Sequence, residues 1–185
     1  GFIDPWKDAK QRYGIGPLDP MILFVGRMTH QKGPDLLLES IPEVIRDHPN
    51  TKFVFVGEGY LKPQLENRTR ELNLGHAVRF AGHASDEEKA KLLKACECLT
   101  VPSRNEPFGI VVLEAWSSGK PVVTTHETGA GDLVWHDVTG LKVYQNSNSI
   151  AWGVKNILSN PGKARWMGEN GRNAAKNIFA WDKIA

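Results

Sequence analysis

The chain has 185 residues, which is enough for one domain of ordinary size with a buried core. Hydrophobic residues make up 41% and charged residues 24%, a balance that excludes an intrinsically disordered chain, and no apolar run reaches the ~20 residues of a membrane span. The formal net charge of +2 gives no electrostatic reason to expect nucleic acid or an acidic membrane as a partner.

Apolar, β-branched runs alternate along the chain with amphipathic stretches. The runs predict buried strands at residues 21–26, 52–57, 77–82, 98–103, 121–125 and 140–144. The amphipathic stretches predict helices at 34–48, 60–73, 85–95, 108–118, 147–159 and 161–180. This alternation predicts the α/β class, with a doubly wound parallel sheet of about six strands and helices on both faces. In the usual strand order 3-2-1-4-5-6, ligands bind beyond the carboxyl ends of the neighbouring first and fourth strands.

The loop after the first predicted strand, residues 26–33, carries two cations. Arg27 offers a fork of donors and Lys32 a compact charge, a combination that suits a diphosphate. The alternative is two solvated cations on a surface loop. The loop has neither G-x-G-x-x-G nor a P-loop sequence, and the Gly57 turn after the second strand is weak evidence because such turns often need glycine.

The loop after the fourth predicted strand leads into a helix that carries two carboxylates. We expect Pro107 at the first helical position, with Asn105 or Glu106 near the cap. Backbone amides near Phe108 and Gly109 would then be free to bind oxygen atoms. Glu114 follows among apolar residues, which predicts a buried carboxylate. Eight residues of helix rise ~12 Å, a separation that suits the two ends of an elongated polar ligand.

Each carboxylate also has a purely structural interpretation. Glu106 would then interact only with the helix dipole, and Glu114 would be satisfied by a neighbouring side chain. On the ligand interpretation, Glu114 would accept from two adjacent hydroxyls, as carboxylates do for ribose in dinucleotide sites.

The remaining candidates are glycines, histidines and cysteines. Gly129 and Gly131, after the fifth strand, either let a ligand approach the backbone or form an ordinary turn. No histidine set has a metal-binding pattern. The only cysteines, Cys96 and Cys98, are too close in sequence for a typical disulfide, and we interpret them as small buried residues in a reducing compartment rather than as a redox pair.

Taken together, these segments resemble family 4 retaining glycosyltransferases. The resemblance covers essentially the whole chain and includes the spacing of Glu106 and Glu114 in "EPFGIVVLE". It also includes "GFID", "VGRMTHQKG", "VGEGY", "VRFAGHAS", "EAWSSGKPVV", "TGAGD" and "FAWDKIA". It implies the Rossmann-like, nucleotide-sugar-binding C-terminal domain of a GT-B enzyme.

The resemblance also implies roles for individual residues. Arg27 and Lys32 would grip the donor diphosphate, Glu106 the transferred sugar and Glu114 the ribose, while the base would pack near residues 78–80, mostly through backbone contacts. The catalytic set would be Arg27, Lys32 and Glu106. The donor-binding set would be Gly26, Gly57, Val78, Arg79, Phe80, Pro107, Phe108, Gly109, Ile110 and Glu114. The donor would be a UDP-, GDP- or ADP-sugar, transferred with retention at the anomeric carbon and without a metal or other cofactor.

The chain departs from the family pattern in the loop after the fifth strand, where Asp132 stands in place of a glutamate and one glycine is replaced. The resemblance further implies that residues 1–185 are one domain of a longer cytoplasmic protein. Its N-terminal acceptor domain would be the main partner and would make any peripheral membrane contact. We expect the isolated domain to catalyse no transfer.

Two other functions are compatible with these residues. One is a different GT-B enzyme, such as a sugar-nucleotide epimerase or a phosphorylase, although no pyridoxal-binding lysine motif is present. The other is a nucleotide-binding regulatory module without catalysis.

Overall fold

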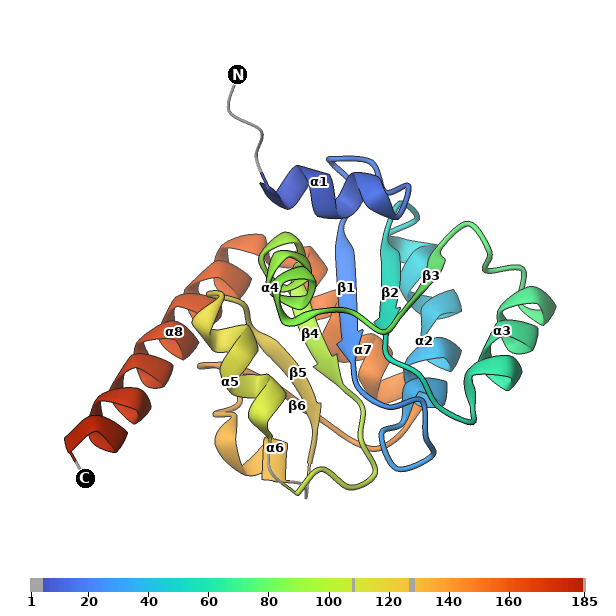
Figure 1. Ribbon diagram of the computed structural model, residues 1–185. Helices are drawn as coiled ribbons and strands as arrows, with labels where there is room; N and C mark the ends of the chain where they lie inside the picture. Colours follow the sequence, from blue (N-terminus) through green and yellow to red (C-terminus); the bar gives the residue numbers. More distant parts are fainter. Residues whose placement is uncertain (1–4, 108, 127–128, 185) are drawn as a thin grey trace.

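A computed structural model describes residues 5–107, 109–126 and 129–184. At its centre is one parallel sheet with the strand order β3-β2-β1-β4-β5-β6 (Figure 1). The strands are β1 (Met21–Val25), β2 (Lys52–Val56), β3 (Val78–Gly82), β4 (Cys98–Val101), β5 (Val122–Thr125) and β6 (Gly140–Val143). The predicted fold class and strand order are confirmed.

Helices cover both faces of the sheet (Figure 1). They are α1 (Pro5–Arg12), α2 (Pro34–Asp47), α3 (Lys62–Glu71), α4 (Asp86–Ala95), α5 (Ile110–Ser117), α6 (Gly129–Leu133), α7 (Ser147–Ser159) and α8 (Pro161–Ile184). The sequence analysis missed α1 and α6. Helix α6 has five residues, two of them glycine, which is too short and too poor in helix formers to show a periodic pattern.

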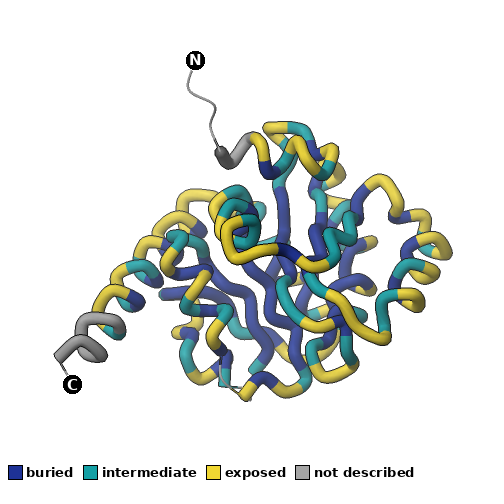
Figure 2. Tube along the Cα trace, in the orientation of Figure 1, coloured by how far each residue is buried: buried dark blue, intermediate teal, exposed yellow. Residues whose placement is uncertain are grey.

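The sheet separates two hydrophobic cores because successive side chains of a strand point to opposite faces. Ile22 and Phe24 of β1 pack with the apolar sides of α2 and α7. Met21 and Leu23 pack on the other face with α4 and α5. The central strands are therefore almost entirely buried, as Figure 2 shows, while the outer surfaces of the helices are exposed.

Cys96 and Cys98 are both buried and neither forms a disulfide. Burial raises the pKa of the Cys96 thiol to about 12 and moves that of Cys98 in the same direction. Both thiols are therefore protonated at neutral pH, which agrees with their interpretation as small core residues. Within the described residues, no helix is long and apolar enough to cross a membrane.

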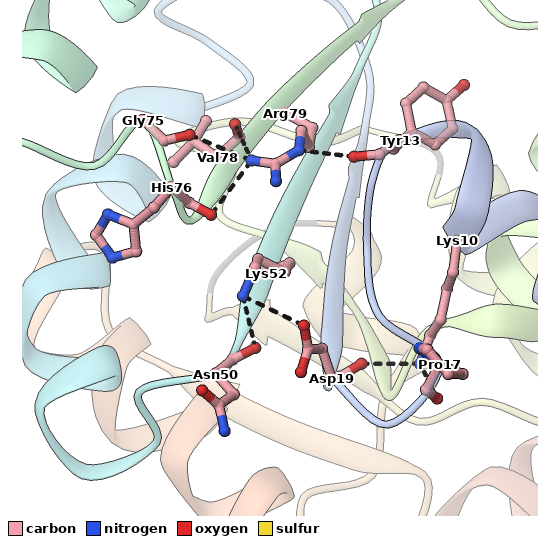
Figure 3. A network of polar contacts seen from close by, with 10 residues as sticks. All are labelled: Lys10, Tyr13, Pro17, Asp19, Asn50, Lys52, Gly75, His76, Val78 and Arg79. Atoms are coloured by element: carbon pink, nitrogen blue, oxygen red, sulfur yellow. Dashed lines mark hydrogen bonds and ion pairs between the residues drawn. The ribbon is translucent and has the colours of Figure 1, made fainter.

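Polar contacts connect the chain around α1 to the amino edge of the sheet (Figure 3). Arg79 of β3 donates to the carbonyl oxygen of Tyr13 at 2.7 Å. Lys10 donates to the carbonyl oxygen of Asp19 at 2.8 Å, and the Asp19 carboxylate pairs with Lys52 at 3.4 Å. These contacts stabilise the edge opposite to the one where ligands bind in such sheets.

Candidate functional site

The loops after β1 and β4 lie against each other at the carboxyl edge of the sheet. Gly33, the N-cap of α2, has a φ of 70°, and a Cβ atom there would lie 2.0 Å from the carbonyl oxygen of Pro102. The backbone N–H of Arg104 donates to the carbonyl oxygen of Gln31 at 2.8 Å. A glycine is thus required for the two loops to approach so closely.

This approach brings together two residues predicted for the site. The Lys32 ammonium lies 2.6 Å from a carboxylate oxygen of Glu106, a contact that joins residues 74 positions apart in the sequence. The two side chains are 26% and 11% exposed, so the ion pair is partly shielded from solvent. A cation and an acceptor are therefore placed side by side where the sheet topology predicts a ligand.

The pair opens onto a groove of about 240 Å³ that also includes the predicted residue Glu114. Lys89 of α4 and Ile110 of α5 line the same groove. Lys89, Ile110 and Glu114 also line a second hollow of about 480 Å³ between α4 and α5. The two hollows share a wall, so an elongated ligand has room to extend from Lys32 along α5.

The structure corrects the expected geometry of the two glutamates. Glu114 is exposed, whereas Glu106 is the buried carboxylate, at 8% exposure. Helix α5 begins at Ile110, after Gly109 with a φ of 62°, so Pro107 is not a helical residue and Glu106 does not cap the helix. The helical rise of ~12 Å therefore does not separate the glutamates, since Pro107 and Gly109 between them lie outside the helix.

Helix α5 instead presents an outward stripe to the groove. Ile110, Glu114 and Ser117 are exposed and follow the spacing i, i+4, i+7, which places them on one helical face. Ile110 is 62% exposed despite its apolar side chain. Val112 and Trp116, two positions before and after Glu114, belong to the opposite, buried face, which explains why a buried carboxylate was expected.

The other predicted residues of the β1 loop lie at the same edge. Arg27 is exposed there. The N–H of Gly26 donates to the carbonyl oxygen of Val56 at 3.0 Å, and a Cβ atom on Gly57 would lie 1.8 Å from the carbonyl oxygen of Gly26. Gly57 therefore has a structural reason of its own, because the absence of a side chain lets the loops after β1 and β2 pack together.

Two of the residues predicted near the base lie away from the groove, at the beginning of β3. Val78 is its first residue and is buried, and the Arg79 guanidinium is bound to backbone carbonyl oxygens, including that of Gly75, at the amino edge. Phe80 stacks on Phe55 at a centroid distance of 5.4 Å and belongs to the core. The structure therefore does not bring these three side chains to the groove. Phe108 is outside the described residues.

Sequence reasoning missed the pair of Arg104 and Asp35. Both guanidinium Nη atoms of Arg104 donate to the Asp35 carboxylate, at 2.9 and 2.7 Å. Burial alone would raise the pKa of Asp35, but the hydrogen bonds and charge of Arg104 lower it overall. A single sequence holds no signal that links these residues, which are 69 positions apart.

Across the described residues, no group of three or more His, Cys, Asp or Glu side chains is arranged to hold a metal ion. The polar character of the groove comes from the facing charges of Lys32 and Glu106, with Lys89 and Glu114 at its wall.

Residues 7–174 match the family model of the glycosyl transferases group 1. The chain belongs to this family. Among its relatives, the uncharacterized glycosyltransferase MJ1607 of Methanocaldococcus jannaschii is 35% identical over 99% of this chain and 50% of its own length. Glycogen synthase of Mycobacterium tuberculosis is 32% identical over 97% of this chain and 43% of its own length.

Anabaena HepE, solved in complex with UDP-glucose, superposes with a TM-score of 0.86 over 96% of this chain and 49% of its own, at 24% sequence identity. This likeness and the family match confirm the Rossmann-like half of a GT-B glycosyltransferase fold. The group 1 glycosyltransferase chain spans about half the length of the curated relatives that it matches.

In this glycosyltransferase chain the loop after β5 contacts the site loops directly. The N–H of Gly129 donates to the carbonyl oxygen of Glu106 at 2.6 Å, and a Cβ atom on Gly129 would lie 2.4 Å from the carbonyl oxygen of Pro107. Gly129 thus allows the backbones of the two loops to come close together. Gly131 is buried in α6. His126 lies beside Tyr144 at a ring distance of 5.2 Å.

Substitution of Gly33 by alanine tests the close approach of the loops. Gly14 is a matched control, because its φ of 66° is nearly the same as the 70° of Gly33 but no heavy atom lies within 4 Å of its ideal Cβ. We expect Gly14→Ala to cost about 1 kcal/mol, the cost of the backbone conformation alone, and Gly33→Ala to cost clearly more. Urea unfolding followed by circular dichroism measures both, and equal losses would contradict the close packing of Gly33 on Pro102.

Proposed function

We propose that this chain is the donor-binding half of a retaining glycosyltransferase that holds a nucleotide sugar in the groove at the carboxyl edge of β1 and β4. The contact of Lys32 with Glu106 at 2.6 Å carries the proposal, because it places a cation for phosphate beside an acceptor for sugar hydroxyls. Glu114 lines the same groove and would accept from the ribose hydroxyls.

The charges on this edge suit the chemistry of glycosyl transfer. Breaking the bond between the sugar and the phosphate builds negative charge on the leaving diphosphate. Lys32 and the exposed Arg27 would stabilise that charge, the task that a metal ion performs in other enzymes. We propose that the reaction needs no bound metal for this reason.

The relatives support the class of ligand. HepE was solved with UDP, with UDP and glucose, and with UDP-glucose, and its fold matches this chain along 96% of its length. The donor of this chain is accordingly proposed to be a UDP-, GDP- or ADP-sugar. Transfer is proposed to need the further half that the relatives possess, since the groove residues bind only the donor.

Donor binding is tested by calorimetry on this chain with UDP-, GDP- and ADP-sugars in the presence of EDTA. We expect at least one of them to bind. If binding disappears on chelation and returns with Mg²⁺ or Mn²⁺, the metal-independent part of the proposal is wrong. If none binds under either condition, the donor-binding function is wrong.

The two glutamates should differ in what they recognise. Glu114→Gln should weaken binding of the free nucleoside diphosphate about tenfold, because a hydrogen bond to a charged group contributes ~1.5 kcal/mol or more. Glu106→Gln should leave the free nucleotide almost unaffected but remove the additional affinity that the attached sugar provides. Glu169→Gln on the exposed side of α8 is the control and should change neither. Equal effects of the first two substitutions on plain nucleotide would contradict these roles.

A further inference from the structure

We infer that Arg104 is a positioning residue that holds the loop of Glu106 in place while the donor occupies Lys32. The inference rests on the proposed function of the groove. Arg104 does not line the groove itself, so it acts on the donor through Glu106.

The Arg104 side chain is fixed at three points on the loop after β1 and on α2. Its guanidinium donates to both carboxylate oxygens of Asp35, at 2.9 and 2.7 Å, and to the carbonyl oxygen of His30 at 2.7 Å. A bidentate pair of this kind defines the orientation of both partners, because the planar guanidinium matches the carboxylate. Asp35 is itself fixed in the first turn of α2, where a negative charge is favourable.

Hydrogen bonds also join the backbone at Gln31, in the loop after β1, to that of Arg104 and Asn105, in the loop after β4. The N–H groups of Arg104 and Asn105 both donate to the carbonyl oxygen of Gln31, at 2.8 and 3.3 Å, and the Gln31 side chain donates back to the carbonyl oxygen of Asn105 at 3.2 Å. Lys32 follows Gln31, and Glu106 follows Asn105. The contacts of residues 104 and 105 therefore determine where Lys32 and Glu106 meet.

Glu106 depends on these contacts because regular structure does not hold it. Strand β4 ends at Val101 and helix α5 begins only at Ile110. The N–H of Gly129 donates to the Glu106 carbonyl oxygen, and the Glu106 carboxylate has one further attachment, the ion pair with Lys32. A diphosphate bound to Lys32 would compete with Glu106 for the ammonium and weaken this ion pair. The position of Glu106 against the sugar would then depend more on Arg104.

Another arginine provides a matched control. Arg68 makes a two-point contact with Glu39 of α2, at 2.6 and 3.2 Å, one helical turn after Asp35. Arg68 lies on α3, and its described contacts are with Glu39 and Glu71 rather than with the site loops. It therefore tests the loss of an arginine fork on α2 without a change at Glu106.

The experiment measures the sugar increment, defined as the ratio of the dissociation constants of the nucleoside diphosphate and its sugar derivative. Arg104→Lys keeps the charge but loses the bidentate fork. We expect it to reduce the sugar increment about tenfold and to change the affinity for plain nucleotide less than about twofold, since small displacements of a positioning group have large effects. Asp35→Asn should have the same effect, and the double variant should be no worse than either single one, because both remove one interaction. Arg68→Lys should leave both affinities unchanged.

The outcomes separate this inference from the proposed function. If the unmodified chain binds no nucleotide sugar, the proposed function fails and this inference fails with it. If the unmodified chain binds and Arg104→Lys and Asp35→Asn retain the full sugar increment, the inference alone is overturned. An equal loss of affinity for nucleotide and nucleotide sugar would also overturn it, because that is the result of general loosening. If Arg104→Lys fails to fold, Asp35→Asn decides the question.

Discussion

Replacement of Lys32 by alanine should lower the kcat of sugar transfer by ~10²–10³, the loss seen when one donor to a developing anion is removed. On the proposed mechanism, charge on the leaving diphosphate grows during the reaction, so Lys32 would contribute more in the transition state than in the bound ground state. Its ammonium lies in a groove with a side-chain exposure of 26%, where charges interact more strongly than in water. We expect a smaller effect on donor affinity.

The assay uses a protein that joins this chain to the further half found in its relatives. Lys52→Ala is the control, because Lys52 is another partly buried lysine and pairs with Asp19 at the opposite edge of the sheet (Figure 3). It should leave kcat unchanged. If Lys32→Ala changes only KM, Lys32 binds the donor equally well in the ground state and in the transition state, which would contradict this mechanism. Robust transfer by the 185-residue chain alone would contradict the proposed need for a second half.

The sheet and the place of the site could be predicted because both depend on simple periodicity. Buried parallel strands are continuous apolar runs, and their order places the ends of β1 and β4 together. Lys32 and Glu106 were therefore expected at one edge from the sequence, and the structure places them in contact.

Other features could not be predicted, because they depend on where helices begin or on contacts between distant residues. The left-handed conformation of Gly109 delays the start of α5 until Ile110, and Glu114 shares the exposed face of this helix with Ile110 and Ser117. The pairing of Arg104 with Asp35 depends on the packing of two loops and leaves no local pattern. The side chains of residues 78–80 lie away from the groove, a detail that a motif match could not supply because it does not distinguish the two ends of a strand.

Substitution of Trp116 by alanine should cost more stability than any other single change proposed for this chain. Trp116 of α5 is 2% exposed, and its indole N–H donates to the carbonyl oxygen of Thr139 at 3.2 Å. It packs so closely on α8 that a Cβ atom on Gly171 would lie 2.4 Å from its ring. The substitution would leave a cavity between these helices and an unsatisfied carbonyl, and we expect it to cost ~3–5 kcal/mol of the free energy of unfolding.

Urea unfolding followed by far-ultraviolet circular dichroism measures this loss, with Trp166→Ala as the control. Trp166 lies on α8 but is 53% exposed, so its removal should change stability by less than ~0.5 kcal/mol. A loss at Trp116 as small as that at Trp166 would show that the two helices repack without a cavity. The substitution should also weaken nucleotide binding in the fraction that remains folded, because α5 carries Glu114 and Ile110 into the groove. Full affinity in that fraction would mean that the groove wall does not depend on the packing of α5 against α8.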